Sequence, residues 1–469
     1  MIADLKPYPE YRPAEGGWLG EIPSHWAVRR MKYVVQETDS RSTSGKEQLL
    51  RISQYTGVTQ RRRADGIDEP DTRADSLVGY KRVEPNDLVI NIMLAWNGSM
   101  GVSQYSGIAS PAYCVYRFKP DLHPWYFHNL LRSPAYKARI KAASTGVVES
   151  RLRLYSDDLN RIEAMLPPPA EQAAIVRFLD WANGRLERAI RAKRKVIALL
   201  NEQKQAIIHR AVTRGLDPSV PLKPSGIPWL GDIPQHWEVR KIKSLVKTAG
   251  GMTPNKGVER YWVGRTPWVS PKDMKVPEIF DSEDHISDAA LRETNIALIS
   301  GPAVLIVVRG MILARTFPTA VTRVPVTINQ DMKALTPRPE LSADYFVLLL
   351  TGIQRELLEL VEIAGHGTCC LRTDSWAAFC LPIPPLEEQI SIRTFLSTEL
   401  ATSNTAISRL ESEIELLREY RTRLVADVVT GKLDVREAAA RLPEKDAPDP
   451  VEGIDVSDET EPADEEAAA

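Results

Sequence analysis

Arginine, lysine, asparagine and glutamine residues recur in polar segments between short apolar runs, and these residue types can contact nucleic acid. A guanidinium forks onto the O6 and N7 atoms of guanine, a carboxamide matches adenine, and any cation neutralises phosphates. For any single residue an ordinary solvated surface is the simpler interpretation, so the prediction depends on the whole set. The candidates are Arg51, Gln54, Arg61, Arg62, Arg63, Lys81, Asn97, Arg151 and Arg153 in the first part of the chain, and Asn255, Lys256, Lys272, Arg309, Arg315, Asn329 and Arg372 in the second.

Signatures of catalysis are missing from the sequence. It has no phosphate-binding loop, HExxH zinc motif, GxSxG nucleophile elbow, or NPPY or NPPF motif of adenine methyltransferases. Two Asp-x-Lys tripeptides, 273–275 and 331–333, match the end of a metal-dependent nuclease motif, although such tripeptides are common by chance. The four cysteines lack CxxC spacing, so no zinc ribbon is predicted. We therefore expect a non-catalytic chain with no metal or cofactor of its own.

Charge is distributed unevenly along the chain. The net charge is −2, but residues 443–469 contain eleven acidic residues and one lysine, so the preceding residues carry about +8. The acidic end has few large apolar residues and is predicted to be disordered, whereas the basic remainder suits a polyanionic partner. No apolar stretch approaches the roughly 20 residues of a membrane helix, and the first residues lack an apolar secretion segment. A cytoplasmic protein without a membrane partner is expected.

An internal repeat organises the sequence. The segment GWLGEIPSHW at 17–26 returns as PWLGDIPQHW at 228–237, displaced by 211 positions. Tyr-Phe at 126–127 returns at 345–346, and the PPxxEQ pattern at 167–172 returns as PPLEEQ at 384–389. Val-Thr at 212–213 with Leu-Asp at 216–217 returns at 429–430 and 433–434. Four ordered matches at nearly one spacing indicate a tandem duplication.

Each PPxxEQ segment opens a long predicted helix. Apolar residues alternate in steps of four and three over 179–211 and again over 396–428, which is typical of a coiled-coil seam. Both runs lack proline and end near a glycine, Gly215 or Gly431. Polar seam residues, Asn183, Lys193, Lys204 and Arg421, weaken pairing but can fix its register. Chain order requires the two helices to run antiparallel if they pair with each other.

The predicted fold is α+β with a pseudo-two-fold internal repeat. Two mixed α/β domains, 1–165 and 216–382, are joined by antiparallel coiled-coil helices within 166–215 and 383–438, and an acidic tail follows at 439–469. Strands are predicted at 87–92, 113–118 and 303–308, and short helices at 126–131 and 345–360. Because the two domains share little sequence between the repeated anchors, they suit two modules that read different targets.

The repeated order of WLGxIPxHW, basic run, variable domain and PPxxEQ helix resembles the specificity subunit of type I restriction-modification enzymes, over roughly residues 10–436. The resemblance implies two target-recognition domains, each reading one half of a bipartite, asymmetric double-stranded DNA site. It also implies that the helices set the spacing and bind two modification subunits, which methylate adenine with S-adenosylmethionine. Restriction subunits would add ATP- and Mg-dependent cleavage.

Two other interpretations remain open. A coiled-coil scaffold would bind proteins without DNA specificity. A self-contained nuclease would cleave DNA with a metal and would depend on Lys275 or Lys333.

Overall fold

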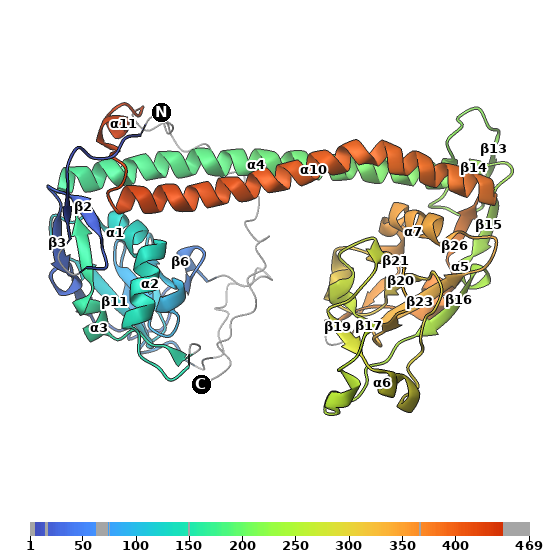
Figure 1. Cartoon of the computed structure of the whole chain (residues 1–469), viewed down its shortest axis with the longest axis horizontal. Helices are drawn as coiled ribbons and strands as arrows, with labels where there is room; N and C mark the ends of the chain where they lie inside the picture. The colour runs from blue at the N-terminus through green and yellow to red at the C-terminus, as the bar shows by residue number, and fades with distance from the viewer. Residues whose placement is uncertain are drawn as a thin grey trace. The chain divides into compact units, whose positions relative to one another are not determined.

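The computed structural model describes residues 5–14, 17–61, 74, 76–148, 151–364 and 367–443. The chain forms two compact units. Unit 1 is Met1–Arg191 with Ile414–Ala469, and unit 2 is Ala192–Glu413. Two long helices, α4 (Pro169–Arg214) and α10 (Leu386–Val429), each contribute one part to each unit (Figure 1).

Unit 1 is built on a four-stranded antiparallel sheet in the order β4-β11-β8-β9. Its short helices are α1 (Pro124–Leu131), α2 (Pro134–Ala143), α3 (Ser156–Arg161) and α11 (Arg436–Ala440), with 3₁₀ turns η2 (Met31–Tyr33) and η3 (Ala95–Asn97). Its strands are β1 (Tyr11–Pro13), β2 (Glu21–Pro23), β3 (Ala27–Arg30), β4 (Val35–Thr38), β5 (Leu50–Ser53), β6 (Gly57–Gln60), β7 (Lys81–Val83), β8 (Leu88–Asn91), β9 (Met100–Val102), β10 (Gly107–Ala109), β11 (Tyr113–Phe118) and β12 (Glu163–Leu166).

Unit 2 has a five-stranded sheet in the order β16-β23-β20-β21-β18. Its short helices are α5 (Ile242–Leu245), α6 (Asp288–Glu293), α7 (Ala343–Gly352), α8 (Gln354–Leu358) and α9 (Thr373–Ala378), with 3₁₀ turns η5 (Glu259–Tyr261), η6 (Pro271–Asp273) and η7 (Met311–Ala314). Its strands are β13 (Leu222–Pro224), β14 (Asp232–Pro234), β15 (Glu238–Lys241), β16 (Val246–Gly250), β17 (Thr266–Val269), β18 (Glu278–Ile279), β19 (Asp284–Ile286), β20 (Val304–Val307), β21 (Thr319–Thr322), β22 (Thr327–Ile328), β23 (Met332–Pro337), β24 (Val361–Ile363), β25 (Cys369–Leu371) and β26 (Cys380–Ile383).

The two sheets share one strand order, with β4, β11, β8 and β9 corresponding to β16, β23, β20 and β21. The strand registers of the two units agree as well. β3 pairs with β12 through Ala27 and Leu166, and β15 pairs with β26 through Glu238 and Ile383. These positions differ by 211 and 217, the displacements of the sequence repeat. The predicted internal repeat is confirmed as a repeated fold.

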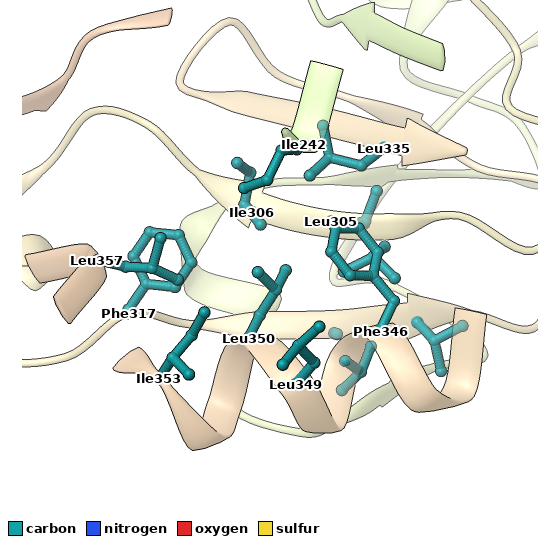
Figure 2. Close-up of a cluster of buried hydrophobic side chains, with 14 of the residues drawn as sticks. Ile242, Leu305, Ile306, Phe317, Leu335, Phe346, Leu349, Leu350, Ile353 and Leu357 are labelled. Atoms are coloured by element: carbon teal, nitrogen blue, oxygen red, sulfur yellow. The ribbon is translucent and has the colours of Figure 1, made fainter. Parts of the chain in front are cut away.

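The core of unit 2 lies between α7 and its sheet. Side chains spaced three or four residues apart on α7, including Phe346, Leu349 and Leu350, point at the face of the sheet that carries Leu305 (Figure 2). All four are at most 1% exposed. Complete burial of such a side chain contributes roughly 1.5 to 3 kcal/mol, which explains why this helix forms where its sequence is almost wholly apolar.

The single helix predicted at 345–360 is wrong, because the structure divides it into α7 and α8 at Ile353. Helix α4 supplies the physical reason. The carbonyls of Thr351 and Gly352 accept hydrogen bonds from Gln205 Nε2, at 2.7 and 3.1 Å, and His209 Nδ1 donates to Gly352 O at 3.1 Å. These side-chain donors occupy the last carbonyls of α7, and the helix ends there.

The long helices pair antiparallel within each unit, which confirms the predicted seam. In unit 1, Leu179 near the start of α4 and Val428 near the end of α10 share one core, and Arg421 Nη1 lies 3.3 Å from Glu187 Oε2. In unit 2, Ala211 near the end of α4 shares a core with Leu396 near the start of α10. Lys193 and Glu413 form the corresponding ion pair there. None of the helices in the described ranges has the length and apolar character that a bilayer crossing requires.

Unit 1 continues past the predicted start of the acidic tail. Ala439 and Leu442 are 2% and 6% exposed, and Arg177 Nη2 donates to Leu442 O at 2.8 Å and to Pro443 O at 3.1 Å. Residues 439–443 therefore pack on the domain rather than belonging to a tail. The rest of the predicted tail, 444–469, lies outside the described residues.

Candidate nucleic-acid interface

One end of the unit 2 sheet gathers most of the candidate residues of that unit. Strands β16 and β20 end there and β23 begins there, because β23 runs antiparallel to both neighbours. Asn255 and Lys256 follow β16, Arg309 and Arg315 follow β20, and Asn329 precedes β23. The repeated scaffold thus brings residues more than 70 positions apart to one edge.

Hydrogen bonds hold these segments together at the edge. Thr253 Oγ1 donates to Gln330 Oε1 at 2.5 Å, which joins the segment after β16 to the turn before β23. The Gly310 N–H donates to Cys369 O at 2.9 Å, which joins the segment after β20 to β25. Arg372 follows β25 directly, so it belongs to the same group.

Three cations of this group have no counter-ion within the part of the chain that the structure describes. Lys256, Arg309 and Arg315 are exposed, and no carboxylate among the described residues lies within 4.0 Å of their charged groups. Arg372 lies 4.0 Å from Glu362, a distance and exposure at which an ion pair contributes little. We name the four cations Lys256, Arg309, Arg315 and Arg372 the unit 2 cationic edge.

Met311 also lies at this edge and was missed by the sequence analysis. It is 64% exposed and starts η7, between Arg309 and Arg315. An exposed apolar side chain among cations is suited to contact a thymine methyl group. Its sequence context, GMILA, looks like a core segment, so the sequence carries no signal for this position.

The corresponding end of the unit 1 sheet carries Asn97, Arg151 and Arg153. Asn97 ends η3, which follows β8, and the two arginines are exposed. The Leu154 N–H donates to Ile92 O at 2.9 Å and fastens the arginine segment to the end of β8. The bond from Leu371 N–H to Val308 O at 2.8 Å occupies the matching place in unit 2.

The β5–β6 hairpin carries Arg51, Gln54 and Arg61, all half-buried. Its turn lies against the segment that follows η3, because Arg132 bonds to both. Arg132 Nη2 donates to Gln54 O at 2.9 Å and Nη1 donates to Gly98 O at 3.0 Å. Gln54 and Asn97 are therefore neighbours. Two further predicted residues, Arg62 and Arg63, lie outside the described residues.

Two predicted contact residues, Lys81 and Asn329, are buried, so little of either side chain is open to a partner. Lys81 is 7% exposed, and its ammonium lies 3.7 Å from Glu37 and 3.8 Å from Asp39. Asn329 is 6% exposed, and its amide donates to Asp331 Oδ2 at 3.3 Å while its oxygen accepts from the Asp331 N–H at 3.1 Å. A buried cation needs partners, and the partners of Lys81 come from a segment about 40 residues earlier.

Lys272 is exposed but shares its charge with two carboxylates. It lies 2.9 Å from Asp284 and 3.0 Å from Glu283. Hydrogen bonds to Asp284 and Glu283 raise the pKa of the Lys272 ammonium to about 12. With its charge offset in this way, Lys272 is a weaker phosphate contact than the residues of the cationic edge.

The repeated glutamates of the PPxxEQ segments join each domain to a long helix, a role that the sequence analysis did not predict. In unit 1, Glu171 accepts hydrogen bonds from Tyr8 OH at 2.5 Å and Trp26 Nε1 at 2.9 Å, and its second oxygen lies 2.7 Å from His25 Nε2. The glutamate lies in the first turn of α4, so it joins His25 and Trp26 of the repeated motif to the helix that leaves the domain.

Unit 2 repeats this arrangement with Glu388 at the start of α10. Its Oε2 atom accepts from Trp237 Nε1 at 3.0 Å and lies 2.7 Å from His236 Nε2. The retention of Glu and His-Trp together in both copies was the sequence signal that could have predicted the contact. The motif is therefore structural, and it positions each domain on its helix.

The same tryptophans also contact the end of the other helix. Gly215 follows α4 with φ of +73°, and Gly431 follows α10 with φ of +77°. A Cβ at Gly215 would approach Trp237 to 3.3 Å, and one at Gly431 would approach Trp26 to 3.2 Å. The left-handed conformation and the close approach both require glycine. Each domain is thereby held at two points, by the beginning of one helix and the end of the other.

His128 is a half-buried, neutral base beside Arg132. Its Nδ1 atom accepts a hydrogen bond from the Val102 N–H at 3.1 Å, so the ring proton is on Nε2. Burial, together with the positive charge of Arg132, lowers the pKa of His128 from 6.5 to about 3.

We expect unit 1 to lose stability as the pH falls from about 6.5 toward 3. In that window the unfolded chain binds a proton at His128 that the folded chain does not, which costs about 2 kcal/mol by pH 5. Urea unfolding at several pH values, followed by hydrogen exchange in α1, measures the loss. His128→Asn keeps an acceptor for the Val102 N–H, so this part of the pH dependence should disappear. An unchanged dependence in the variant would contradict the assignment.

Comparison with known proteins relates this architecture to one group. Residues 234–416 match the family model of the type I restriction modification DNA specificity domain. The chain is 32% identical over 180 residues, 38% of its length, to the EcoR124I/EcoR124II specificity subunit of Escherichia coli. It is 31% identical over 173 residues, 36% of its length, to the MjaIX specificity subunit of Methanocaldococcus jannaschii. These alignments span 45% and 39% of the two relatives, less than half of each.

Two further matches extend over nearly the whole chain. A putative MjaX specificity subunit from Methanocaldococcus jannaschii is 21% identical over 454 residues, which cover 89% of this chain and 96% of that protein. A solved chain from a type I restriction-modification system superimposes with a TM-score of 0.61 at 17% identity, covering 88% of this chain and 99% of that one. The duplicated α/β domain with an antiparallel helix pair is thus a fold found in that class of system. The chain is thus similar to type I restriction-modification specificity subunits, through the domain at residues 234–416 and through the aligned parts of these relatives.

Proposed function

We propose that this chain reads a bipartite, asymmetric sequence in double-stranded DNA, with each unit contacting one half. One observation carries the proposal: a single scaffold occurs twice, and the same strand ends present two different sets of basic and amide residues. A shared scaffold provides one way of approaching DNA, while unlike side chains at the edge select different bases. The target should therefore have two unlike halves.

We also propose that the chain directs chemistry that partner subunits perform. The relatives are subunits of type I restriction enzymes, and this sequence lacks the motifs of methyltransferases and translocases. Two modification subunits would bring S-adenosylmethionine and methylate adenine. Restriction subunits would add cleavage that requires ATP and Mg. We propose that S-adenosylmethionine, ATP and Mg bind to the partner subunits and not to this chain.

Gel-shift titration with the full chain and its modification subunits tests DNA reading against the scaffold alternative. We expect one duplex sequence to be retarded in preference to others, and the logarithm of the binding constant should fall steeply with salt, by about 0.9 per phosphate contacted for each unit of log salt. Retention of a protein partner without any preference among duplexes would favour the scaffold.

The nuclease alternative is disfavoured by the hydrogen bonds that the Asp273 carboxylate makes. Asp273 accepts hydrogen bonds from the Ser270 N–H at 2.8 Å, Ser270 Oγ at 3.0 Å and the Glu283 N–H at 2.9 Å, which makes it a structural cap of η6. Incubation of the isolated chain with duplex DNA and Mg²⁺ tests the alternative. Cleavage that is lost on changing Lys275 or Lys333 would support it.

The length of α4 should set the gap between the half-sites. Four residues inserted after Lys195 add about 6 Å of rise, comparable with one or two base pairs at about 3.4 Å each. A step of four is tolerated by a coiled-coil seam, so the helix pair should persist. Binding-site selection should return the same half-sites with the gap altered by one or two base pairs.

A variant of unchanged length provides the control for the insertion. Arg194 and Lys195 are exposed on α4, and their replacement by alanine alters the same surface without changing the rise. This variant should retain the original gap. An insertion variant that also retains it would argue against a role for the helix in spacing.

A further inference from the structure

We propose that Arg132 is a positioning residue for base recognition by unit 1, and that it acts on one half-site only. The proposal rests on the function proposed above. Arg132 follows α1 and reaches between the β5–β6 turn and the segment from η3 to β9. Both of these segments carry candidate base contacts.

The guanidinium of Arg132 donates five hydrogen bonds, all to main-chain carbonyls. Its Nη1 atom donates to Ser53 O at 3.3 Å, Gly98 O at 3.0 Å and Met100 O at 2.6 Å. Its Nη2 atom donates to Gln54 O at 2.9 Å and Tyr55 O at 2.8 Å. Three of these carbonyls belong to the hairpin turn and two to the segment beyond η3, so one side chain fixes the separation of the two.

Arg132 makes these bonds without a carboxylate partner among the described residues. Burial lowers its pKa to about 10, so it stays charged at neutral pH. Carbonyl dipoles stabilise the cation in place of a counter-ion, and His128 beside it is neutral. A half-buried charge held by main-chain dipoles is sensitive to their placement, and the hairpin turn and the second segment are correspondingly restrained.

The restrained segments present side chains suited to read bases. Gln54 lies in the turn, Tyr55 beside it is 52% exposed, and Asn97 lies directly before Gly98. Base-edge hydrogen bonds form only over a narrow range near 3 Å, so a displacement of about 1 Å would remove discrimination while leaving phosphate contacts in place. Arg132 therefore supports specificity more than affinity.

Unit 2 has no arginine at the position that corresponds to Arg132. The sequence repeat places Thr351 where unit 1 has Arg132, and its hydroxyl donates to Val347 O at 2.8 Å and lies 3.2 Å from Thr319 Oγ1. These bonds stay within α7 and its neighbouring strand. The effect of Arg132 should consequently be confined to the half-site that unit 1 reads.

Binding-site selection with the full chain and its modification subunits tests the proposal on Arg132→Ala and Arg132→Lys. The half-site weakened by Arg309→Ala is assigned to unit 2, and the other to unit 1. For Arg132→Ala we expect discrimination at the unit 1 half-site to fall at least about tenfold, the loss of one good base contact, with the unit 2 half-site unchanged. Lysine retains a charge and up to three donors, so Arg132→Lys should restore part of the discrimination. Thr351→Ala is the matched control and should leave the unit 1 half-site unchanged.

The outcomes separate this proposal from the function on which it rests. If the unmodified chain selects no bipartite sequence, the proposed function fails. If it does, and folded Arg132→Ala retains full discrimination at the unit 1 half-site, the positioning role is overturned. Equal losses at both half-sites, or a lower melting temperature without loss of discrimination, would also overturn it, because they indicate a structural role alone.

Discussion

Replacement of Glu171 by alanine is expected to lower the free energy of unfolding of unit 1 by about 3 to 5 kcal/mol, the usual cost of breaking a buried charged network. The carboxylate is 4% exposed and accepts from Tyr8, His25 and Trp26. Its removal leaves the Tyr8 hydroxyl and the Trp26 N–H buried without an acceptor. Chemical unfolding, followed by hydrogen exchange in residues 17–30, measures the change.

Glu388→Ala is the matched control, because Glu388 holds the second copy of the motif in a more open setting. Its side chain is 26% exposed and its carboxylate bonds to His236 and Trp237. We expect a loss of about 1 to 2 kcal/mol in unit 2, since water can reach part of the site. Equal losses in both units would contradict the role assigned to burial, and no loss in either would show that the contact does not hold the domain on its helix.

Removal of the unit 2 cationic edge should have the second large effect. A quadruple alanine variant of Lys256, Arg309, Arg315 and Arg372 is expected to weaken binding of the cognate duplex at least about a hundredfold. The slope of log binding constant against log salt should also become shallower, by up to about 3.6 if all four residues contact phosphates. Base recognition by some of them would give a smaller change in slope and lost selectivity at one half-site. Fluorescence anisotropy over a range of salt concentrations measures both quantities.

The control removes the same charge from the opposite end of the same sheet. Lys241, Lys243, Lys247 and Arg338 are exposed, and Lys247 and Arg338 lie where β16 begins and β23 ends. Their quadruple alanine variant should change affinity and slope only slightly. If the two variants weaken DNA binding equally, binding depends on net charge alone. That result would contradict a specific role for the unit 2 cationic edge.

The long helices and the repeat were predictable because each leaves a regular signal in the sequence. The seam predicted over 179–211 and 396–428 lies within α4 and α10, and the strands predicted at 87–92, 113–118 and 303–308 include β8, β11 and β20. Burial of apolar residues dictates these patterns directly. The helix predicted at 345–360 failed because its end depends on Gln205 and His209, whose positions relative to it only the fold determines.

The candidate interface was less predictable, because exposure of a polar residue depends on contacts that are distant in sequence. Arg309 and Arg315 lie exposed at one end of the unit 2 sheet, whereas Lys81 is buried against Glu37 and Asp39. Nothing in the local sequence distinguishes these cases. Arg132 was missed for a related reason, since its acceptors are main-chain carbonyls 32 to 79 residues away and its counterpart in the other copy is a threonine. Contact of any of these residues with DNA stays a prediction.

Selection of binding sites from random duplexes, with the full chain and its modification subunits, tests the central claim most directly. If units 1 and 2 recognise different sequences and the pair of long helices sets their spacing, the selected DNA should contain a single motif with two different half-sites at a fixed gap. The Arg309→Ala variant should relax one half and Arg132→Ala the other. A contiguous or palindromic motif, half-sites at freely varying gaps, or no enriched sequence would contradict the account.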